Sequence, residues 1–224
     1  MSGMLGEGNE LLLWAKGTGF EWALAILIFG VIVRLIEIFS LGRKIDLATA
    51  RENSPGSGWK TVLSRSYSYK IPSTRAALTY FTGYIFHIGL LITVLFLIPH
   101  IEIWKSLFNF GWPGLPTSVI DLIAVITMLA LLVLLFDRIT NPVKRQLTTA
   151  KDYLAWLVTF LPLMTGYLTY HHMWFPYSQM LALHILSVEL LMVVLPFTKL
   201  IHSVTIFISR WYNGDQFARK GVAS

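Results

Sequence analysis

Long runs of apolar residues alternate with short polar segments along this chain of 224 residues. A helix that crosses a membrane needs about 20 mostly apolar residues. Five stretches satisfy this length: 20–39, 76–98, 118–136, 153–170 and 179–200. Prolines stand close to their boundaries, where a missing N–H is tolerated at the start or end of a helix. The pattern predicts an all-α membrane protein, a single domain (1–224) that forms a bundle of five transmembrane helices.

The composition agrees with this prediction. Charged residues make up only 13% of the chain, against about 25% in soluble domains, and the mean hydropathy is +0.62. The chain has no cysteine. This excludes disulfides, iron–sulfur clusters, thiolate zinc sites and covalently attached c-type haem within the chain.

The basic residues predict the orientation of the helices. The net charge is +6, which by itself suits either nucleic acid or anionic membrane lipid. Lys16 and Lys105 fall on one side of the predicted membrane. The basic residues on the other side are Arg43, Lys44, Arg51, Lys60, Arg65, Lys70, Arg75, Arg138, Lys144, Arg145, Lys151, Arg210, Arg219 and Lys220. By the positive-inside rule we expect the N-terminus outside, the C-terminus in the cytoplasm and 40–75 as the largest cytoplasmic loop. The charge indicates topology and contact with lipid, with no nucleic-acid partner.

Histidines in the predicted spans are the candidate chemical groups, because an ionisable residue in a membrane is functional by default. His184 and His202 are 18 residues apart. In a continuous helix this is five whole turns, so both side chains share a face and lie about 27 Å apart along the axis. That rise approaches the ~30 Å hydrocarbon thickness. Imidazoles near both membrane surfaces, without cysteine, favour iron in two b-type haems.

Each haem iron needs a second axial ligand, and the second predicted helix runs antiparallel to the fifth. His87 lies on its cytoplasmic half, where it can pair with His202, and His100 lies at its outer end, where it can pair with His184. The 13 residues between His87 and His100 turn their side chains roughly 140° apart on a straight helix. We expect a break at Ile98-Pro99 to correct this angle.

Other histidine assignments stay open at this point. His171 and His172, at the outer end of the fourth predicted helix, are alternative outer ligands. A lone histidine in a membrane also serves as an interhelical hydrogen-bonding group, and this alternative applies above all to His87.

At these residues the chain resembles the gamma subunit of respiratory nitrate reductase and its relatives, the cytochrome b subunits of sulfite-reductase-linked, hydrogenase-linked and heterodisulfide-reductase complexes. The matching motifs are Phe86-His87-Ile88-Gly89, Leu183-His184 and Leu195-Pro196-Phe197-Thr198-Lys199-Leu200-Ile201-His202. The resemblance covers predicted helices two to five, and helix one by position only. In the nitrate reductase branch the second histidine of helix two falls at the position of Leu97; His100 is the nearest substitute, so a relative that serves another complex fits better.

The resemblance implies two b haems near opposite membrane faces, with His87 and His202 as ligands of the inner haem and His184 as a ligand of the outer haem. It implies electron transfer between the quinone pool and an iron–sulfur subunit docked on the cytoplasmic face. The chain would be the membrane-anchoring electron-transfer subunit of a respiratory oxidoreductase complex in the cell inner membrane, and its basic inner loops suit an acidic partner.

Quinol oxidation releases protons, so a quinone site near the outer haem should offer proton acceptors. We predict this site at Asp121, His171 and His172. Asp121 also fits a simpler role, because the dipole of a helix stabilises a carboxylate at its N-terminus. The two histidines also fit an interfacial position without a chemical role.

Two other functions fit parts of the pattern. One is a b-type cytochrome that exchanges electrons with a periplasmic c-type cytochrome. The other is a non-redox membrane anchor or transporter, which has less support because the sequence has no internal repeat and no row of charges along a pore.

Overall fold

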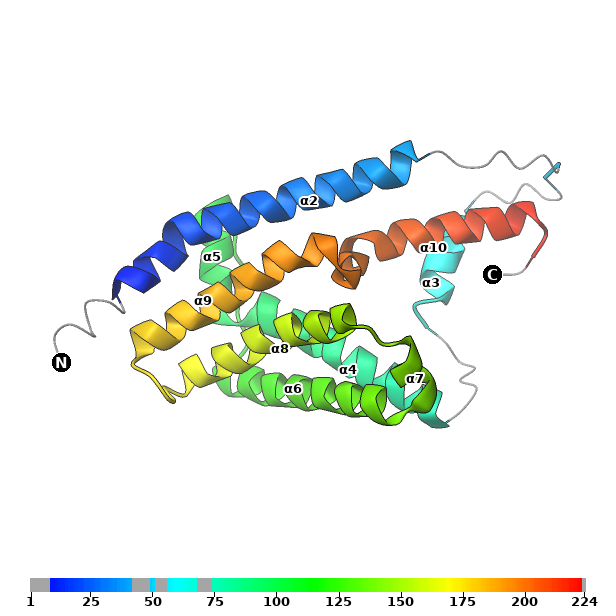
Figure 1. Cartoon of the computed structure of the whole chain (residues 1–224). Coiled ribbons are helices and arrows are strands. Elements are labelled where there is room, and N and C mark those ends of the chain that lie inside the picture. The colour runs from blue at the N-terminus through cyan, green and yellow to red at the C-terminus, as the bar shows by residue number, and fades with distance from the viewer. Residues whose placement is uncertain (1–8, 42–48, 51–55, 68–73, 223–224) are drawn as a thin grey trace.

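A computed structural model of the chain describes residues 9–41, 49–50, 56–67 and 74–222. Within these ranges the regular structure is entirely helical. In chain order the elements are η1 (Ala15–Gly19), α2 (Phe20–Ser40), α3 (Ser57–Ser64), α4 (Thr74–Phe96), α5 (Ile98–Phe108), α6 (Thr117–Thr140), α7 (Pro142–Leu147), α8 (Ala150–Tyr170), α9 (Tyr177–Val194), η2 (Leu195–Phe197), η3 (Lys199–Ile201) and α10 (His202–Arg219). Figure 1 shows their arrangement.

Four helical segments are long and apolar enough to cross a membrane, which identifies a multi-pass membrane protein. They are Asn9–Ser40, Ala76–Phe96, Thr117–Thr140 and Tyr177–Phe197. The stretch 153–170, which we predicted as a further span, is also helical and forms most of α8. Its apolar character is weaker, because threonine and tyrosine interrupt its leucines, and it is not among the four.

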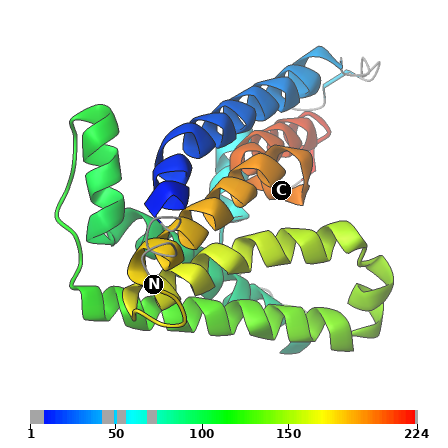
Figure 2. The same cartoon turned by 60° about the vertical axis from the view of Figure 1, so that its left-hand side comes forward.

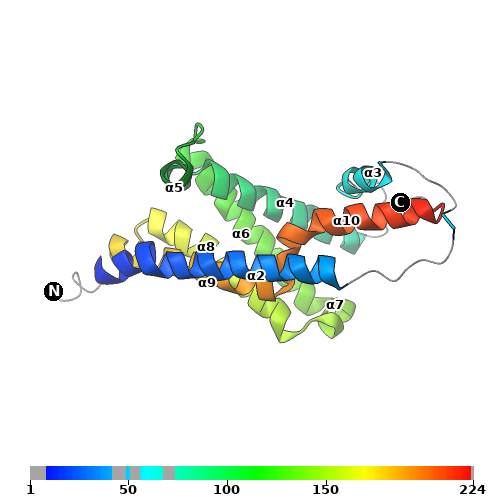
Figure 3. The same cartoon turned by 90° about the horizontal axis from the view of Figure 1, so that it is seen from above.

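The long helices pack in neighbouring pairs. α4 packs against α6, α8 against α9, and α2 against α9, while α6 and α8 join the two sets. Seen from above, α2 lies over α9 (Figure 3). The core includes Phe86 of α4, Ala130 and Leu131 of α6, and Leu163 of α8. This core therefore sits where α4, α6 and α8 meet. One of its residues, Phe86, directly precedes His87, the first histidine of the predicted site.

Two breaks in the helices decide where the histidines point. The expected break before Pro99 is confirmed: α4 ends at Phe96, Leu97 is extended (φ −75°, ψ 126°), and α5 starts anew at an angle to α4 (Figure 2). The expectation of one continuous helix over 179–200 is wrong. α9 ends at Val194, because Pro196 cannot continue the hydrogen-bond ladder, and two 3-10 turns follow before α10 begins at His202.

The segment predicted as a cytoplasmic loop contains helical structure. α3 packs along α10, which runs past the end of α9 and away from the N-terminus (Figure 1). An ideal Cβ on Gly214 of α10 would lie 2.3 Å from Thr61 Oγ1, so glycine permits this close approach. Arg43, Lys44, Arg51 and Lys70 of the predicted loop lie outside the described residues.

Candidate metal centres

Four of the six histidines form two facing pairs. His87 on α4 faces His202 at the start of α10, with ring centroids 6.0 Å apart. His100 on α5 faces His184 on α9, with ring centroids 6.2 Å apart. The backbones of α4 and α9 do not pack closely in the described part of the chain. The paired rings are therefore points at which the α4–α6 half and the α8–α9 half of the bundle approach each other.

The inner pair, His87 and His202, is oriented by its own backbone. His87 Nδ1 donates to the carbonyl of Gly83 (2.7 Å), and His202 Nδ1 donates to the carbonyl of Lys199 (2.7 Å). A carbonyl oxygen only accepts, so the proton of each neutral ring is on Nδ1 and the lone pair is on Nε2. Both side chains are exposed in the protein alone, which leaves room beside them.

The outer pair, His100 and His184, is oriented by more distant groups. His100 Nδ1 donates to the carbonyl of Thr93 across the helix break (3.1 Å), and His184 Nδ1 lies 3.3 Å from Thr165 Oγ1 on α8. An ideal Cβ on Gly166 would lie 3.0 Å from the His184 ring, so a side chain at this position would crowd the ring. Burial lowers the pKa of His100 below its ordinary value, which favours the neutral, ligand-competent ring.

The ring separation in each pair fits a metal ion between two imidazoles. An imidazole nitrogen binds a first-row metal at about 2.0–2.1 Å, and two rings across one ion then have centroids about 6 Å apart. An ordinary aromatic pair also spans this distance. The nitrogen atoms distinguish the two, because metal-binding histidines typically donate their second ring N–H to an oxygen. In all four rings an oxygen atom lies 2.7–3.3 Å from Nδ1.

The turn that delivers His202 is fixed by two neighbouring helices. Arg34 Nε of α2 donates to the carbonyl of Pro196 (3.1 Å), and Lys199 Nζ donates to Asp152 Oδ1 of α8 (2.7 Å). The Lys199 contact is the main reason that the pKa of Asp152 lies well below its usual range. Because the Lys199 carbonyl accepts from His202, Asp152 acts on the orientation of His202 through Lys199.

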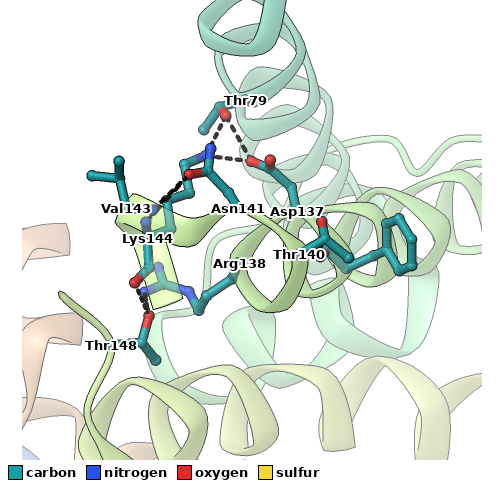
Figure 4. Close-up of polar contacts among 9 residues, drawn as sticks. Thr79, Asp137, Arg138, Thr140, Asn141, Val143, Lys144 and Thr148 are labelled. Atoms are coloured by element: carbon teal, nitrogen blue, oxygen red, sulfur yellow. Dashed lines mark hydrogen bonds and ion pairs between the residues drawn. The ribbon is translucent and has the colours of Figure 1, made fainter. Parts of the chain in front are cut away.

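A polar network anchors the start of α4, two turns before its histidine (Figure 4). Lys144 Nζ of α7 donates to Thr79 Oγ1 (2.5 Å) and forms an ion pair with Asp137 of α6. Thr79 donates to Asp137 Oδ2 (3.0 Å), and Arg138 donates to Thr148 Oγ1 (3.2 Å). These contacts tie α4, α6 and α7 together at the end of the bundle that carries the inner pair.

The glycine of the Phe86-His87-Ile88-Gly89 motif has a packing role. An ideal Cβ on Gly89 would lie 2.0 Å from Thr127 Oγ1 of α6. Any larger residue requires either a rearrangement of the Thr127 side chain or a separation of α4 from α6 near His87. Gly83, one turn before His87, has nothing within 4 Å of its ideal Cβ.

The residues predicted as a quinone and proton site are partly brought together. His171 Nε2 donates to Asp121 Oδ1 (2.9 Å), which joins the end of α8 to the start of α6. The His171 ring lies against Tyr167, with centroids 4.3 Å apart. His172 turns away and lies against Tyr177 (5.3 Å). The structure places His100, rather than His171 or His172, against His184.

Several functional contacts carry no signal in the sequence. Thr165 reaches both His184 and Ser187, whose Oγ is 2.9 Å away, yet threonine is common in α8. Asp152 has the sequence pattern of a helix capping box with Thr149. That pattern accounts for an aspartate at this position, so it gives no reason to predict the contact with Lys199. No group of three or more histidine, cysteine, aspartate or glutamate side chains converges on a metal position in the described residues.

Comparison with known proteins gives one similarity. The chain is 37% identical over 137 residues, 61% of its length, to a Nitratidesulfovibrio vulgaris (Hildenborough) protein whose name, "Protein", states no activity. The match covers 60% of that relative's length. No family model and no solved structure matches the chain.

Proposed function

We propose that this protein is a dihaem b-type cytochrome that carries electrons across the membrane. The observation that supports this function is the two facing histidine pairs, in which each ring has an oxygen atom close to its Nδ1. His87 and His202 would hold the inner haem, and His100 and His184 the outer haem. When bound, haem supplies one-electron redox chemistry. The chain's own residues fix the tautomer and orientation of each ligand.

We further propose that the protein lies in the cell inner membrane and crosses it five times, with the N-terminus outside and the C-terminus in the cytoplasm. α8 supports this count because it packs along α9 and has 21 residues. Its threonine hydroxyls are already satisfied: Thr159 donates to the carbonyl of Ala155, and Thr165 to that of Leu161. Satisfied polar groups lower the cost of placing a helix in lipid.

The proposed electron partners lie on opposite sides. On the outer side, a quinol would deliver electrons, and the Asp121–His171 pair would take up protons. On the cytoplasmic side, the basic residues of the inner loops suit an acidic surface of an iron–sulfur subunit. The protein would then link the quinone pool to a respiratory complex whose other subunits hold the clusters that this cysteine-free chain lacks.

A spectrum of the purified full chain tests the central claim. We expect a reduced-minus-oxidised difference spectrum of b-type haem and two haems per chain. A chain that is purified intact from haem-replete cells without haem absorption would overturn the proposal. Co-purification with a cytoplasmic iron–sulfur protein is the expected result for the partner, whereas co-purification with a periplasmic c-type cytochrome would overturn the cytoplasmic route.

The quinol site has its own test. We expect Asp121→Asn to slow reduction of the haems by a quinol while reduction by dithionite stays normal, because only quinol oxidation needs a proton acceptor. Glu102→Gln is the matched control, since Glu102 is another carboxylate at the predicted outer side and is exposed, 3.8 Å from Lys105. Equal quinol rates in the Asp121 variant and the native chain would remove Asp121 from the site.

A further inference from the structure

A buried carboxyl group in α9 has no place in the function proposed above. Glu189 is only 6% exposed, and its Oε1 atom is buried without a hydrogen-bond partner in the part of the chain that the structure describes. Almost all buried polar atoms in proteins are hydrogen-bonded. An unpaired carboxylate charge in an apolar interior is costly, so this side chain needs an explanation.

The N-terminal helix is shaped to admit this carboxyl group. An ideal Cβ on Gly19 would lie 3.0 and 3.1 Å from the two Glu189 carboxyl oxygens and 2.8 Å from the ring of Trp14. Gly19 ends the π-helical turn η1, in which Gly17 departs from helical geometry (φ −104°, ψ −106°). Turns of this kind inside helices occur frequently at functional sites.

No charged group of the neighbouring elements neutralises Glu189. Charged residues on the elements packed against α9 are Lys16 of η1, Glu21, Arg34 and Glu37 of α2, and Lys151 and Asp152 of α8. Lys16, Glu21 and Lys151 are exposed. Arg34 binds Glu37, and Asp152 binds Lys199. The other ionisable side chain of α9 with acid–base chemistry near neutral pH is His184, five residues earlier and about 7.5 Å away along the axis.

We propose that Glu189 is a proton-binding site in the membrane, coupled to the electron at the outer histidine pair; this inference rests on the proposed function. Glu189 would bind one proton from outer-side water when the haem that His100 and His184 would hold takes up one electron from a quinol or an iron–sulfur cluster. When that electron leaves, the O–H bond breaks and the proton returns to water. The carboxylate balances the charge of the oxidised site, and the neutral acid accompanies the reduced one.

Redox titration of the haem-loaded full chain at several pH values tests the coupling. One proton per electron shifts the potential of the outer haem downward by up to about 59 mV for each tenfold fall in proton concentration. We expect Glu189→Gln to lose most of this slope. Glu21→Gln, which changes an exposed carboxylate on the adjacent helix, should keep it. A native potential that does not vary with pH, or an equal slope in the Glu189 variant, would overturn the coupling.

Two further measurements examine the carboxyl group itself. The redox-difference infrared spectrum should contain a protonated carboxylic acid band that Glu189→Gln removes. A hydrophobic carbodiimide, which adds to protonated acids in apolar surroundings, should label Glu189 and not Glu21. Labelling does not depend on haem, so it separates the two proposals. A chain that contains no haem would contradict the proposed function and the coupling. An unlabelled Glu189 would contradict the proton-binding site even in a chain that contains two haems. Gly19→Ala, which crowds the carboxyl group, should reduce labelling.

Discussion

The two histidine pairs are similar in spacing but differ in what orients them. The inner rings are nearly perpendicular (79°), and each is held by a carbonyl three or four residues earlier in its own segment. The outer rings are nearly parallel (19°), and His184 depends on a hydroxyl of the adjacent helix α8. Hydrogen bonds within the same segment thus orient the two inner rings, and helix packing only brings these rings together. At the outer pair, helix packing brings the rings together and also orients the His184 ring.

The largest expected effect is the loss of one haem when either pair loses a ligand. We expect His202→Ala or His87→Ala to remove the inner haem and His184→Ala or His100→Ala the outer haem, because each iron then lacks one axial nitrogen. Haem per chain should fall from two to one, with different spectra for the two classes. His172→Ala is the control and should keep two haems. Two haems in His100→Ala with one in His171→Ala would reassign the outer ligand.

The second-largest expected effect comes from a packing change that affects the inner pair and not the outer pair. Gly89→Val places side-chain atoms inside Thr127, and overpacking of this kind costs about 1–3 kcal/mol of stability. We expect a lower thermal midpoint and a lower content of inner haem. Gly83→Ala, one turn before His87 where an ideal Cβ meets no atom, should leave the thermal midpoint of the haem-free chain near that of the native chain. Equal losses in both variants would contradict the role of Gly89.

Removal of the Asp152 carboxylate should weaken the inner site alone. Supporting contacts of metal ligands are typically worth 10–100-fold in metal affinity, so we expect a loss in this range for the inner haem in Asp152→Asn and an unchanged outer haem. Lys199→Met should lower inner-haem affinity as well, and the loss in the double variant should be smaller than the sum of the two single losses, since both changes remove the Lys199–Asp152 contact. Haem release measured by absorbance tests this. A weakened outer haem would show a global effect instead.

The same ion pair predicts a dependence on pH. The pKa of Asp152 is lowered in the folded protein, so its stabilising contribution is fully present above the unfolded value of about 3.9. It is lost as the pH falls below that value toward the folded pKa. The contribution of this pair to inner-haem retention should therefore be constant between pH 5 and 8 and should fall in more acid solution. Asp152→Asn should remove that acid-induced fall.

The smallest expected effect concerns the outer pair. Thr165→Val removes the hydroxyl near His184 Nδ1, and we expect less than a tenfold loss of outer-haem affinity because a 3.3 Å contact is long for a hydrogen bond. Thr159→Val on the same helix is the matched control, since the Thr159 hydroxyl donates within its own helix, to the carbonyl of Ala155. A change in the inner haem would contradict the assignment of Thr165 to the outer pair.

Sequence reasoning located the helices better than their ends. The apolar runs predicted the membrane segments, and Pro99 predicted the break that turns His100 toward His184. Pro196 is a similar signal for a break, and it lies between His184 and His202, where a continuous helix was predicted. The two histidines are separated by a helix end and two tight turns, so their alignment comes from packing around Pro196 and not from helical periodicity.

The sequence by itself determined that this is a helical membrane protein with histidines as its candidate metal ligands, because hydropathy and residue type are local properties of the chain. Only the tertiary structure decided which histidine faces which, that His171 instead binds Asp121, and that Glu189 is buried against Gly19. These pairings join residues 50 to 170 positions apart. Such contacts depend on the way whole helices pack, which short-range periodicity does not specify.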